Sequence, residues 1–444
     1  MTAATPTKPR LGRPFGALVT GVLASNASDG FAYFAAPLLV LTITKDPVAV
    51  AAVTAVMQAV PAIFGVIAGS LADTRDRRLL MTAAALVRAV VLAALVVLIV
   101  NDAVTLPALF VALALFSAAE LTFDISSSAS VPDVLDDLHL LERAHGVIGA
   151  GQQVLQGFIV GPFATLFFAW SAQLPFTVGA VLVLVSAVAV IALRRLLDAR
   201  DGMAAGIATD GAGASVRTEA APLSFRERMA GGASEVWNNR PLRNIVIFTI
   251  VLVTLVGFGQ AAYAYYMIEF LDVPTAVLGL VFMALGVGGI LGSVTVHALA
   301  ARFTRRLTMF AGVFLVAAGF GVVGLAPAGA WAPWVTGLGF FAAGLGSGWW
   351  NVLAIAARQR MVPREKLGRV SGFVTTVNAF IAPVAALAGG WVTRMDARLP
   401  WYVAAVGSVL AVLLMGGLMR SIDDVAAAPG PDGEPSSNRM SDPA

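Results

Sequence analysis

The feature that most limits how this chain can fold is a succession of apolar runs, each about 18 residues or longer, along almost its whole length. A run of this length can cross the hydrocarbon core of a bilayer as one helix. Spanning β-strands would instead give segments of about ten residues with alternating polarity, which the sequence lacks. Charged residues make up only 12% of the chain, about half the fraction usual in soluble proteins. We therefore predict an all-α polytopic membrane protein.

Turn signals between the runs divide the chain into twelve predicted transmembrane helices. They cover residues 15–42, 48–71, 79–100, 107–130, 147–169, 174–195, 244–267, 275–300, 307–325, 333–357, 370–391 and 399–419. The first run is too long for the apolar region of a cleavable signal peptide. An even number of helices places both termini on the same side of the membrane.

The distribution of basic residues predicts which side that is. With the N-terminus inside, every lysine and arginine faces the cytoplasm except Lys45, Arg394, Arg398 and the intramembrane Arg88. This asymmetry is what the positive-inside rule requires. We expect a multi-pass protein of the inner (cytoplasmic) membrane, with both termini cytoplasmic and lipids as partners. The net charge is only +3. Because the basic residues are distributed according to the membrane topology, this charge does not indicate nucleic-acid binding.

An internal repeat divides the chain into halves. "LADTRDRRLLM" (71–81) aligns with "LAARFTRRLTM" (299–309), and "VPDVLDDLHLLERAHG" (131–146) resembles "VPREKLGRVSG" (362–372). Both matches fall at equivalent places, after the second helix and between the fourth and fifth helices of each half. Parallel repeats of this kind predict two six-helix bundles around a central cavity. The predicted parts are an N-terminal bundle (1–195), a cytoplasmic linker (196–242), a C-terminal bundle (243–420) and a disordered cytoplasmic tail (421–444).

The linker contains one segment that we expect to be helical. A Gly/Ala-rich stretch is followed by "SFRERMAGGASEVW", in which Ser224 and Glu227 have the spacing of a capping box. Apolar residues then recur at helical spacing, opposite charged ones. This pattern fits a short amphipathic helix in the headgroup layer or, equally well, a soluble linker helix.

The turn after the second helix, "GSLADTRDRRLL" (69–80), concentrates charge in a chain that otherwise avoids it. Gly69 would let two helices approach closely. Asp73 could accept from a helix N-terminus or pair with an arginine. Arg77 and Arg78 would anchor the turn at anionic headgroups, or serve only to set the topology. The second copy has Ala301 at the position of Asp73, so the two halves differ there.

The 6+6 layout and the spacing Gly69-x-Leu71-x-Asp73-x3-Arg77-Arg78 resemble the major facilitator superfamily over residues 15–420. The resemblance implies a transporter in which this signature forms a cytoplasmic gate by a charge contact between the two halves. The "DG" of the first helix, "VPDVL…ERAHG" and "RQRMVP…LGRVSG" resemble the branch with enterobactin exporters and macrolide-efflux proteins.

A second signature of the antiporters in this family lies in the fifth helix. "GFIVGPFAT" supplies Gly157, Gly161 and Pro162, but has Ala164 and Thr165 where the family pattern has glycines. This partial match favours export. The arginine of the family's fourth helix is missing here, so the proton relay built on it cannot be transferred to this chain.

Three carboxylates are predicted to lie inside the bilayer, where an ionisable group is a functional candidate. Asp29 lies roughly 20 Å into the first helix, at 1.5 Å per residue. Glu120 and Asp124 are four residues apart and share one face of the fourth helix. If these helices line the central cavity, as the resemblance implies, neighbouring carboxylates there favour proton exchange near neutral pH. We expect a proton-coupling role for all three; the alternative is a permanent pair, for example with Arg88.

Other polar residues inside the predicted helices are candidates for the substrate cavity, although such groups also bond helix to helix or lie at membrane interfaces. They are Asn26, Gln156, Gln260, Tyr263, Trp350 and Asn351.

Several classes of function are disfavoured. The chain has no cysteine, and its three histidines are far apart, so we expect neither a metal site nor a cofactor. It also lacks a Walker A motif and a plausible catalytic triad, which argues against an enzyme. The leading prediction is a monomeric, proton-coupled antiporter that exports amphipathic small molecules, such as an antibiotic or siderophore. A nutrient importer of the same fold and a non-transporting membrane scaffold or sensor are the alternatives.

Overall fold

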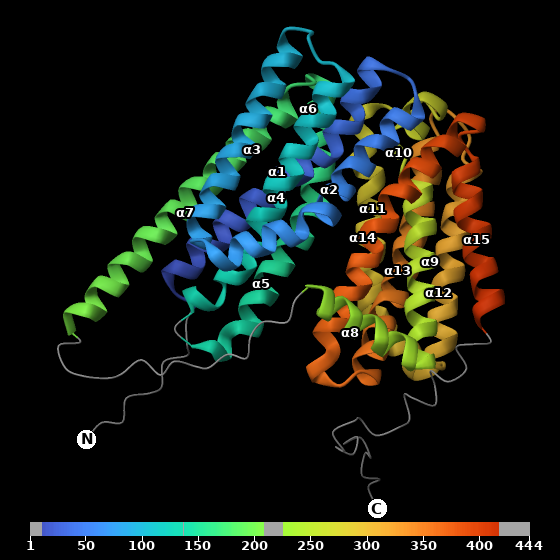
Figure 1. The fold of residues 1–444 in the computed structure, drawn as a ribbon. Coiled ribbons are helices and arrows are strands. Elements are labelled where there is room, and N and C mark those ends of the chain that lie inside the picture. Colours follow the sequence, from blue (N-terminus) through green and yellow to red (C-terminus); the bar gives the residue numbers. More distant parts are fainter. Residues whose placement is uncertain (1–10, 136, 208–224, 417–444) are drawn as a thin grey trace, which may run out of the picture. The chain divides into compact units, whose positions relative to one another are not determined.

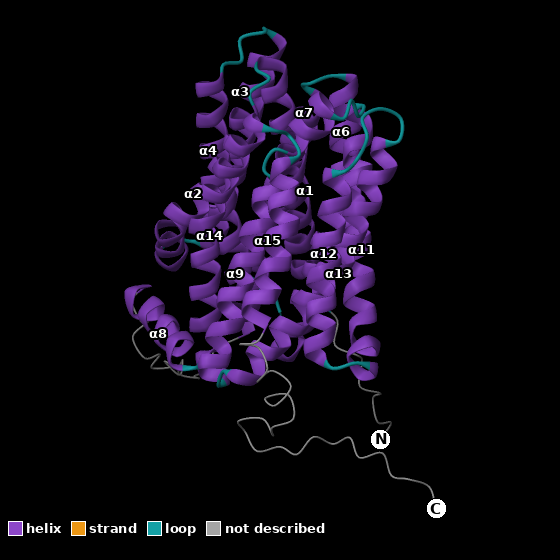
Figure 2. Cartoon of the chain, turned by 90° about the vertical axis from the view of Figure 1, so that its right-hand side faces the viewer, coloured by secondary structure: helices purple, strands orange, loops and turns teal. Residues whose placement is uncertain are grey.

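The computed structural model describes residues 11–135, 137–207 and 225–416. Figure 2 shows helices joined by loops, and these ranges contain no β-strand. A helix satisfies its backbone N–H and C=O groups internally, which is the requirement for crossing lipid. The prediction of an all-α protein with many membrane spans is confirmed.

In the first half of the chain, residues 11–135 and 137–207 form seven α-helices (Figure 1). They are α1 (Gly12–Ile43), α2 (Pro47–Thr74), α3 (Arg77–Val100), α4 (Leu106–Ser130), α5 (Leu141–Val154), α6 (Gly161–Trp170) and α7 (Leu174–Ile207). A π-helical turn, η3 (Leu155–Val160), joins α5 to α6 without a break. Two 3₁₀ turns, η1 (Pro132–Val134) and η2 (Leu138–Leu140), precede α5.

The second half follows the same plan, with one additional helix before it. It comprises α8 (Phe225–Asn238), α9 (Arg240–Gln260), α10 (Tyr263–Tyr265), the π-helical turn η4 (Tyr266–Phe270), α11 (Thr275–Arg302), α12 (Arg305–Gly324), α13 (Ala332–Met361), α14 (Arg364–Met395) and α15 (Leu399–Met415).

Over its described residues, each of the twelve predicted spans overlaps a helical segment of this series. Within the described ranges, ten segments are long and apolar enough to cross a membrane. The described part of α15 is a shorter apolar helix. Helix α1 has 32 residues but falls outside the ten because Asn26 and Asp29 interrupt its apolar sequence. Those polar side chains are buried, so α1 lies in the interior of its bundle.

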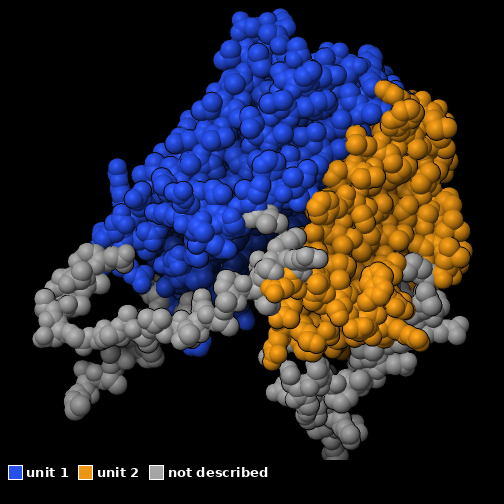
Figure 3. All heavy atoms as spheres, in the orientation of Figure 1, with its two compact units in different colours: residues 1–222, 264–283 blue, residues 223–263, 284–444 orange. Residues whose placement is uncertain are grey.

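The chain divides into two compact units, coloured separately in Figure 3. Unit 1 comprises Met1–Pro222 and Ala264–Met283, and unit 2 comprises Leu223–Tyr263 and Ala284–Ala444. In unit 1, α1 packs on α7, and α3 packs on α4 and α7. In unit 2, α12 packs on α13 and α15, and α9 packs on α14. Segment 264–283 thus belongs to the same compact unit as the first half of the chain. The domain boundaries at 195 and 242 stay a prediction.

Local sequence explains where several helices begin. Asp76 caps α3 by accepting from the backbone N–H groups of Arg78 and Leu79, and Thr304 caps α12 by accepting from the N–H of Leu307. These caps satisfy N–H groups that lack a partner within the helix. They occupy equivalent places in the two copies of the repeat, so the repeated sequence forms a repeated helix–turn–helix.

Helix α8 lies at one end of unit 2, against α14 (Figures 1 and 2). Glu235 accepts a hydrogen bond from Lys366 at 2.9 Å, and Val236 is fully buried. Gly232 lies so close to the Arg369 backbone that a side chain there would collide with it. The amphipathic helix predicted for the linker therefore exists and packs on protein. Ser224 of the predicted capping box and the tail 421–444 lie outside the described residues.

Candidate functional site

The centre of unit 1 contains a fully buried arginine, Arg88 of α3. Its Nη1 donates to the Ser25 hydroxyl at 2.6 Å, and its Nη2 donates to the Ser25 carbonyl at 3.2 Å. The guanidinium carbon lies 4.7 Å from the centre of the Phe116 ring on α4, a cation–π contact. Arg88 therefore joins three helices: α1, α3 and α4.

Asp29 of α1 forms an ion pair with Arg88, and its side chain is 8% exposed. The two opposite charges compensate each other away from solvent, which offsets the cost that either charge would have if it were buried alone. This contact fits the pairing with Arg88 that the sequence left open as the alternative, and the proton-coupling role of Asp29 stays a prediction. Asp29 therefore lies at the predicted depth in α1, but its carboxylate is held by Arg88.

Glu120 and Asp124 lie one turn apart on α4, and both are half-buried. Both are within electrostatic range of Arg88 and of each other. Among the described residues, neither carboxylate accepts a hydrogen bond or forms an ion pair within 4 Å. Three carboxylates thus share one guanidinium, and only Asp29 contacts it directly.

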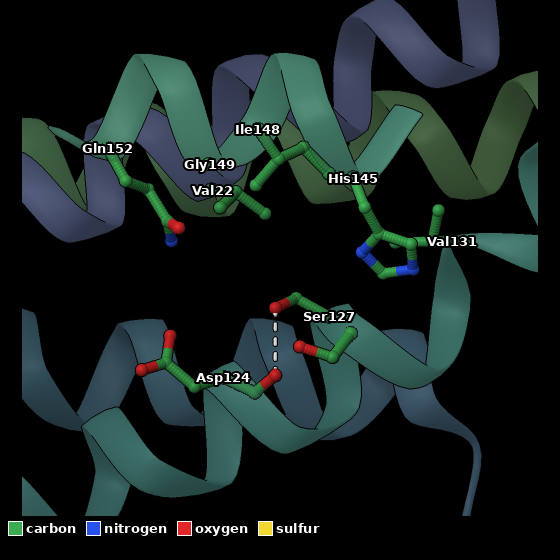
Figure 4. Close-up of a pocket in the computed structure, with 9 residues that line it drawn as sticks. Val22, Asp124, Ser127, Val131, His145, Ile148, Gly149 and Gln152 are labelled. Atoms are coloured by element: carbon green, nitrogen blue, oxygen red, sulfur yellow. Dashed lines mark hydrogen bonds between the residues drawn. The ribbon is translucent and has the colours of Figure 1, made fainter. Parts of the chain in front are cut away.

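A cavity of about 220 Å³ lies between α4 and α5 in unit 1. Figure 4 shows Asp124 on one wall and Gln152 on the other, with their side chains facing each other across the space. Ser127, Ser128 and His145 add further polar groups, and Val22, Val131 and Ile148 supply apolar surface. Asp124 therefore faces a cavity in its own unit, whereas Glu120 does not line it.

Two predicted cavity residues form a contact beside this region. Gln156 donates from Nε2 to the Asn26 Oδ1 at 3.1 Å, and Asn26 is buried. Gln156 lies in the π-helical turn η3. Such single-turn π segments are frequent at functional sites, and here the extra residue of the turn accompanies a polar contact between α1 and the predicted fifth span.

The antiporter signature of the fifth span is a close-packed region. Gly161 lies under the ring of Phe34, where a Cβ would come within 3.0 Å of the ring. Gly279, at the start of α11, packs directly on the backbone of Gly161 and Pro162, and its N–H donates to the Thr165 hydroxyl at 3.1 Å. Thr165 departs from the family pattern, yet its hydroxyl makes a specific bond. Gly157 is less closely packed than Gly161. A Cβ placed at Gly157 would lie 3.8 Å from its nearest neighbour, the Gln153 Nε2.

The two arginines of the predicted gate make specific contacts within unit 1. Arg77 donates from Nη1 to the Ala129 carbonyl at 2.8 Å and to Asp133 at 3.3 Å. Arg78 pairs with Asp198 on α7 at 3.7 Å. A cation at the C-terminal end of α4 is favourable for its unpaired carbonyl groups. These arginines thus join helices, in addition to any effect on topology.

Gly69 and Asp73 do not make the contacts expected of them inside unit 1. A Cβ at Gly69 would meet nothing within 4 Å, so no helix of this unit approaches it closely. Asp73 is exposed and has no hydrogen-bond or ion-pair partner among the described residues. Asp76, which sequence reasoning did not single out, caps the neighbouring helix instead. Its position directly before the helix is the signal that identifies it.

The remaining predicted cavity residues lie in unit 2. Trp350 is buried and packs on Phe248 with ring centres 4.7 Å apart, and it lines a cavity of about 150 Å³ together with Asn351. Tyr263 packs edge-on against Phe340 at 5.4 Å. Gln260 is half-buried and does not line this cavity. The structure thus brings Trp350 and Asn351 together, but not Gln260.

An ion pair that sequence reasoning missed joins the loop between α1 and α2 to the π-helical turn η4. Lys45 donates to the Glu269 carboxylate at 2.7 Å within unit 1. This hydrogen bond, followed by the charge of Glu269, raises the pKa of Lys45 above its ordinary value. No sequence signal connects two residues that are 224 positions apart.

Among the described residues, no group of three or more His, Asp or Glu side chains comes together that could hold a metal ion.

Comparisons with known proteins agree with this architecture. The family model described as Major Facilitator Superfamily matches residues 18–384 and, in a second match, residues 246–439. A bacterial homologue of the iron transporter ferroportin, in an inward-facing state, has a TM-score of 0.69 at 17% identity, covering 92% of this chain and 99% of that one.

Two other solved structures are similar to this chain. The nucleoside transporter NupG has a TM-score of 0.64 at 12% identity, covering 92% of this chain and 100% of that one. An autoinhibited POT family peptide transporter has a TM-score of 0.65 at 14% identity, with 92% and 97% covered. At these identities the similarity concerns the fold alone. A search of curated proteins found no match.

Proposed function

Because this chain belongs to the major facilitator superfamily and is a secondary transporter, we propose that it is a proton-coupled antiporter that exports amphipathic small molecules by alternating access. The observation that carries the proposal is the charge set of unit 1, in which three buried or half-buried carboxylates share the single guanidinium of Arg88. A carboxylate without a partner in such a place costs free energy when ionised, unless it takes up a proton or a cation.

Two of the three carboxylates, Asp29 and Glu120, have different tasks in this proposal. Asp29 is fully engaged with Arg88 and keeps the guanidinium in place. Glu120 has no hydrogen-bond partner among the described residues and is close enough to sense the charge of Arg88. Glu120 is therefore the proposed proton carrier, which releases its proton on one side of the membrane and binds another on the opposite side.

The proposed direction and orientation rest on two features of the sequence. We propose that both termini face the cytoplasm, because this arrangement places almost all basic residues inside. Export is supported by the partial antiporter signature, whose Gly161 and Pro162 form a tight contact with Gly279. An antibiotic or a siderophore is the proposed substrate class, in line with the resemblance to the enterobactin and macrolide exporters.

The experiment measures transport of ethidium in inverted membrane vesicles that contain wild type, Glu120→Gln or Glu142→Gln. An imposed proton gradient should drive ethidium uptake into inverted vesicles with the wild type and with Glu142→Gln, whose exposed carboxylate lies outside the site. Glu120→Gln should abolish this uptake but keep exchange of labelled for unlabelled ethidium, because exchange needs no net proton movement.

Gradient-driven transport by Glu120→Gln at the wild-type rate would contradict the proton-carrier role. Accumulation only in right-side-out vesicles would instead support the importer of the same fold.

A further inference from the structure

We propose that the cavity between α4 and α5 of unit 1 is a subsite for the ammonium head of an organic cation, with the Asp124 carboxylate as its counter-ion. The inference rests on the proposed function, because a subsite of this kind serves an exporter whose substrate carries a positive charge. It assigns to Asp124 a task different from that of Glu120.

The charges of unit 1 leave Asp124 without a direct partner. Arg88 donates to Ser25 and pairs with Asp29. The carboxylate that it contacts directly therefore belongs to α1. Asp124 experiences the field of Arg88 but makes no ion pair within 4 Å in the described part of the chain. A half-buried carboxylate in this situation gains most from a mobile cation that can approach it directly.

The walls of the cavity suit an ammonium group. The Gln152 side chain faces Asp124 across the space (Figure 4), and its amide oxygen can accept a hydrogen bond. The Ser127 hydroxyl donates to the Asp124 backbone carbonyl at 3.0 Å, which leaves its oxygen lone pairs free to accept. A primary ammonium has three N–H donors. The Asp124 carboxylate, the Gln152 amide oxygen and the Ser127 hydroxyl together offer one acceptor for each of them.

The remainder of the cavity suits the first carbon atoms of an amphipathic amine. Val22, Val131 and Ile148 provide apolar surface beside the polar groups. The volume of about 220 Å³ is below the range of about 300–1,000 Å³ that encloses a drug-sized ligand. The cavity therefore takes the charged end of a substrate and leaves the larger part outside.

A divalent metal ion fits this site less well. Calcium and magnesium require about six or more oxygen ligands, and transition metals prefer several imidazole or carboxylate groups. In the described residues, no group of three such side chains comes together, and His145 is the only imidazole among the residues that line this cavity. A single carboxylate with neutral acceptors favours a monovalent organic cation.

The test is isothermal titration calorimetry on the full-length protein in lipid nanodiscs, without a proton gradient. The probes are phenethylamine and 2-phenylethanol, which share the ring and differ in the charge of the head group. Phenethylamine should bind wild type at least about tenfold more tightly than 2-phenylethanol, the difference expected for a hydrogen-bonded charge. Asp124→Asn should remove that difference, whereas Asp124→Glu and the control Glu142→Gln should keep it.

A second measurement does not depend on the stability of Asp124→Asn. The natural chain has no cysteine, so Ser128→Cys places one thiol at the cavity. Phenethylamine should slow the reaction of this thiol with N-ethylmaleimide at least about tenfold at saturation, and 2-phenylethanol or Mn²⁺ should not.

Equal binding of the two probes, unchanged binding by Asp124→Asn, protection of the thiol by Mn²⁺ alone, or no protection would each overturn the proposal. Because binding is measured without a gradient, its failure leaves the test of Glu120 unaffected. Conversely, loss of proton coupling leaves this binding measurement intact.

Discussion

At the residue scale, Arg88 is the buried cation that compensates the carboxylates of unit 1. It is fully buried, and its contacts extend to Ser25, Asp29 and Phe116. Removing one partner of a buried ion pair leaves the other charge without compensation, which is more costly than removing both. Arg88 and Asp29 should therefore depend on each other for stability.

Arg88→Leu should lower the free energy of unfolding by about 3–5 kcal/mol, because Asp29 remains buried without its partner. The double variant Arg88→Leu/Asp29→Leu should recover most of that loss. SDS-driven unfolding in mixed micelles measures both, with the exposed Arg75→Leu as the control, for which a change within about 0.5 kcal/mol is expected. A single variant at Arg88 as stable as the control would contradict the role of the pair.

Sequence reasoning reached part of this centre. It identified Asp29, Glu120 and Asp124 because a carboxylate in an apolar run is unusual at any rotation of the helix. It could not decide which of them contacts Arg88, because that depends on the relative rotation of α1, α3 and α4. The position of Gln152 opposite Asp124 also depends on how two helices are rotated relative to each other, so the sequence could not predict it.

Lys45 offers a prediction for the dependence of stability on pH. The hydrogen bond to Glu269 raises the pKa of Lys45 in the folded protein. The stabilisation that this bond gives to the folded state is therefore fully present below the ordinary lysine pKa of about 10.4. It is lost only as the pH rises through the higher folded value. The difference in melting temperature between wild type and Lys45→Gln should therefore be small and constant from about pH 6 to about pH 9. A difference that shrinks within that range would show that the bond is not the cause.

At the element scale, the helices followed from the apolar runs, but their irregular turns did not. The π-helical turn Leu155–Val160 interrupts a predicted span that reads as continuous in sequence, and the turn Tyr266–Phe270 begins at the last two residues of another predicted span. A π turn adds one residue to the helix without changing its apolar character, so hydropathy does not detect it. The packing of α8 on α14 was missed for a similar reason, since amphipathicity does not identify the surface that an apolar face covers.

The contact of α11 with the antiporter signature provides a prediction at this scale. A Cβ at Gly279 would collide with the backbone of Gly161 and Pro162, and backbone atoms cannot rotate away. Gly279→Ala should destabilise unit 1 by about 1–3 kcal/mol, as overpacking does, although alanine is the better helix former. Gly257→Ala is the matched control, because a Cβ there meets nothing within 4 Å. Equal unfolding free energies for both variants would show that this packing is not tight.

At the scale of the whole molecule, the internal repeat and the charge asymmetry are the strongest sequence signals. The repeat predicted equivalent helix–turn–helix segments, which Asp76 and Thr304 cap in the same way. The asymmetry assigns a side of the membrane to each turn, since basic residues concentrate at alternate turns. Neither signal depends on the rotation of a helix, so both can be read from the sequence alone, and the orientation in the membrane stays a prediction.

The assignment of sides can be tested with single cysteines, because the natural chain has none. Thr74→Cys lies at the end of α2 and Ala103→Cys between α3 and α4, and both positions are exposed. With both termini in the cytoplasm, a membrane-impermeant maleimide added to intact cells should label Ala103→Cys and leave Thr74→Cys unlabelled. Inverted vesicles should give the opposite result, since the same turns then face the other solution. Because the two positions flank a single span, α3, labelling of both from one side would contradict a membrane-crossing α3. Reversed labelling would keep the fold but invert the orientation, and with it the proposed direction of transport.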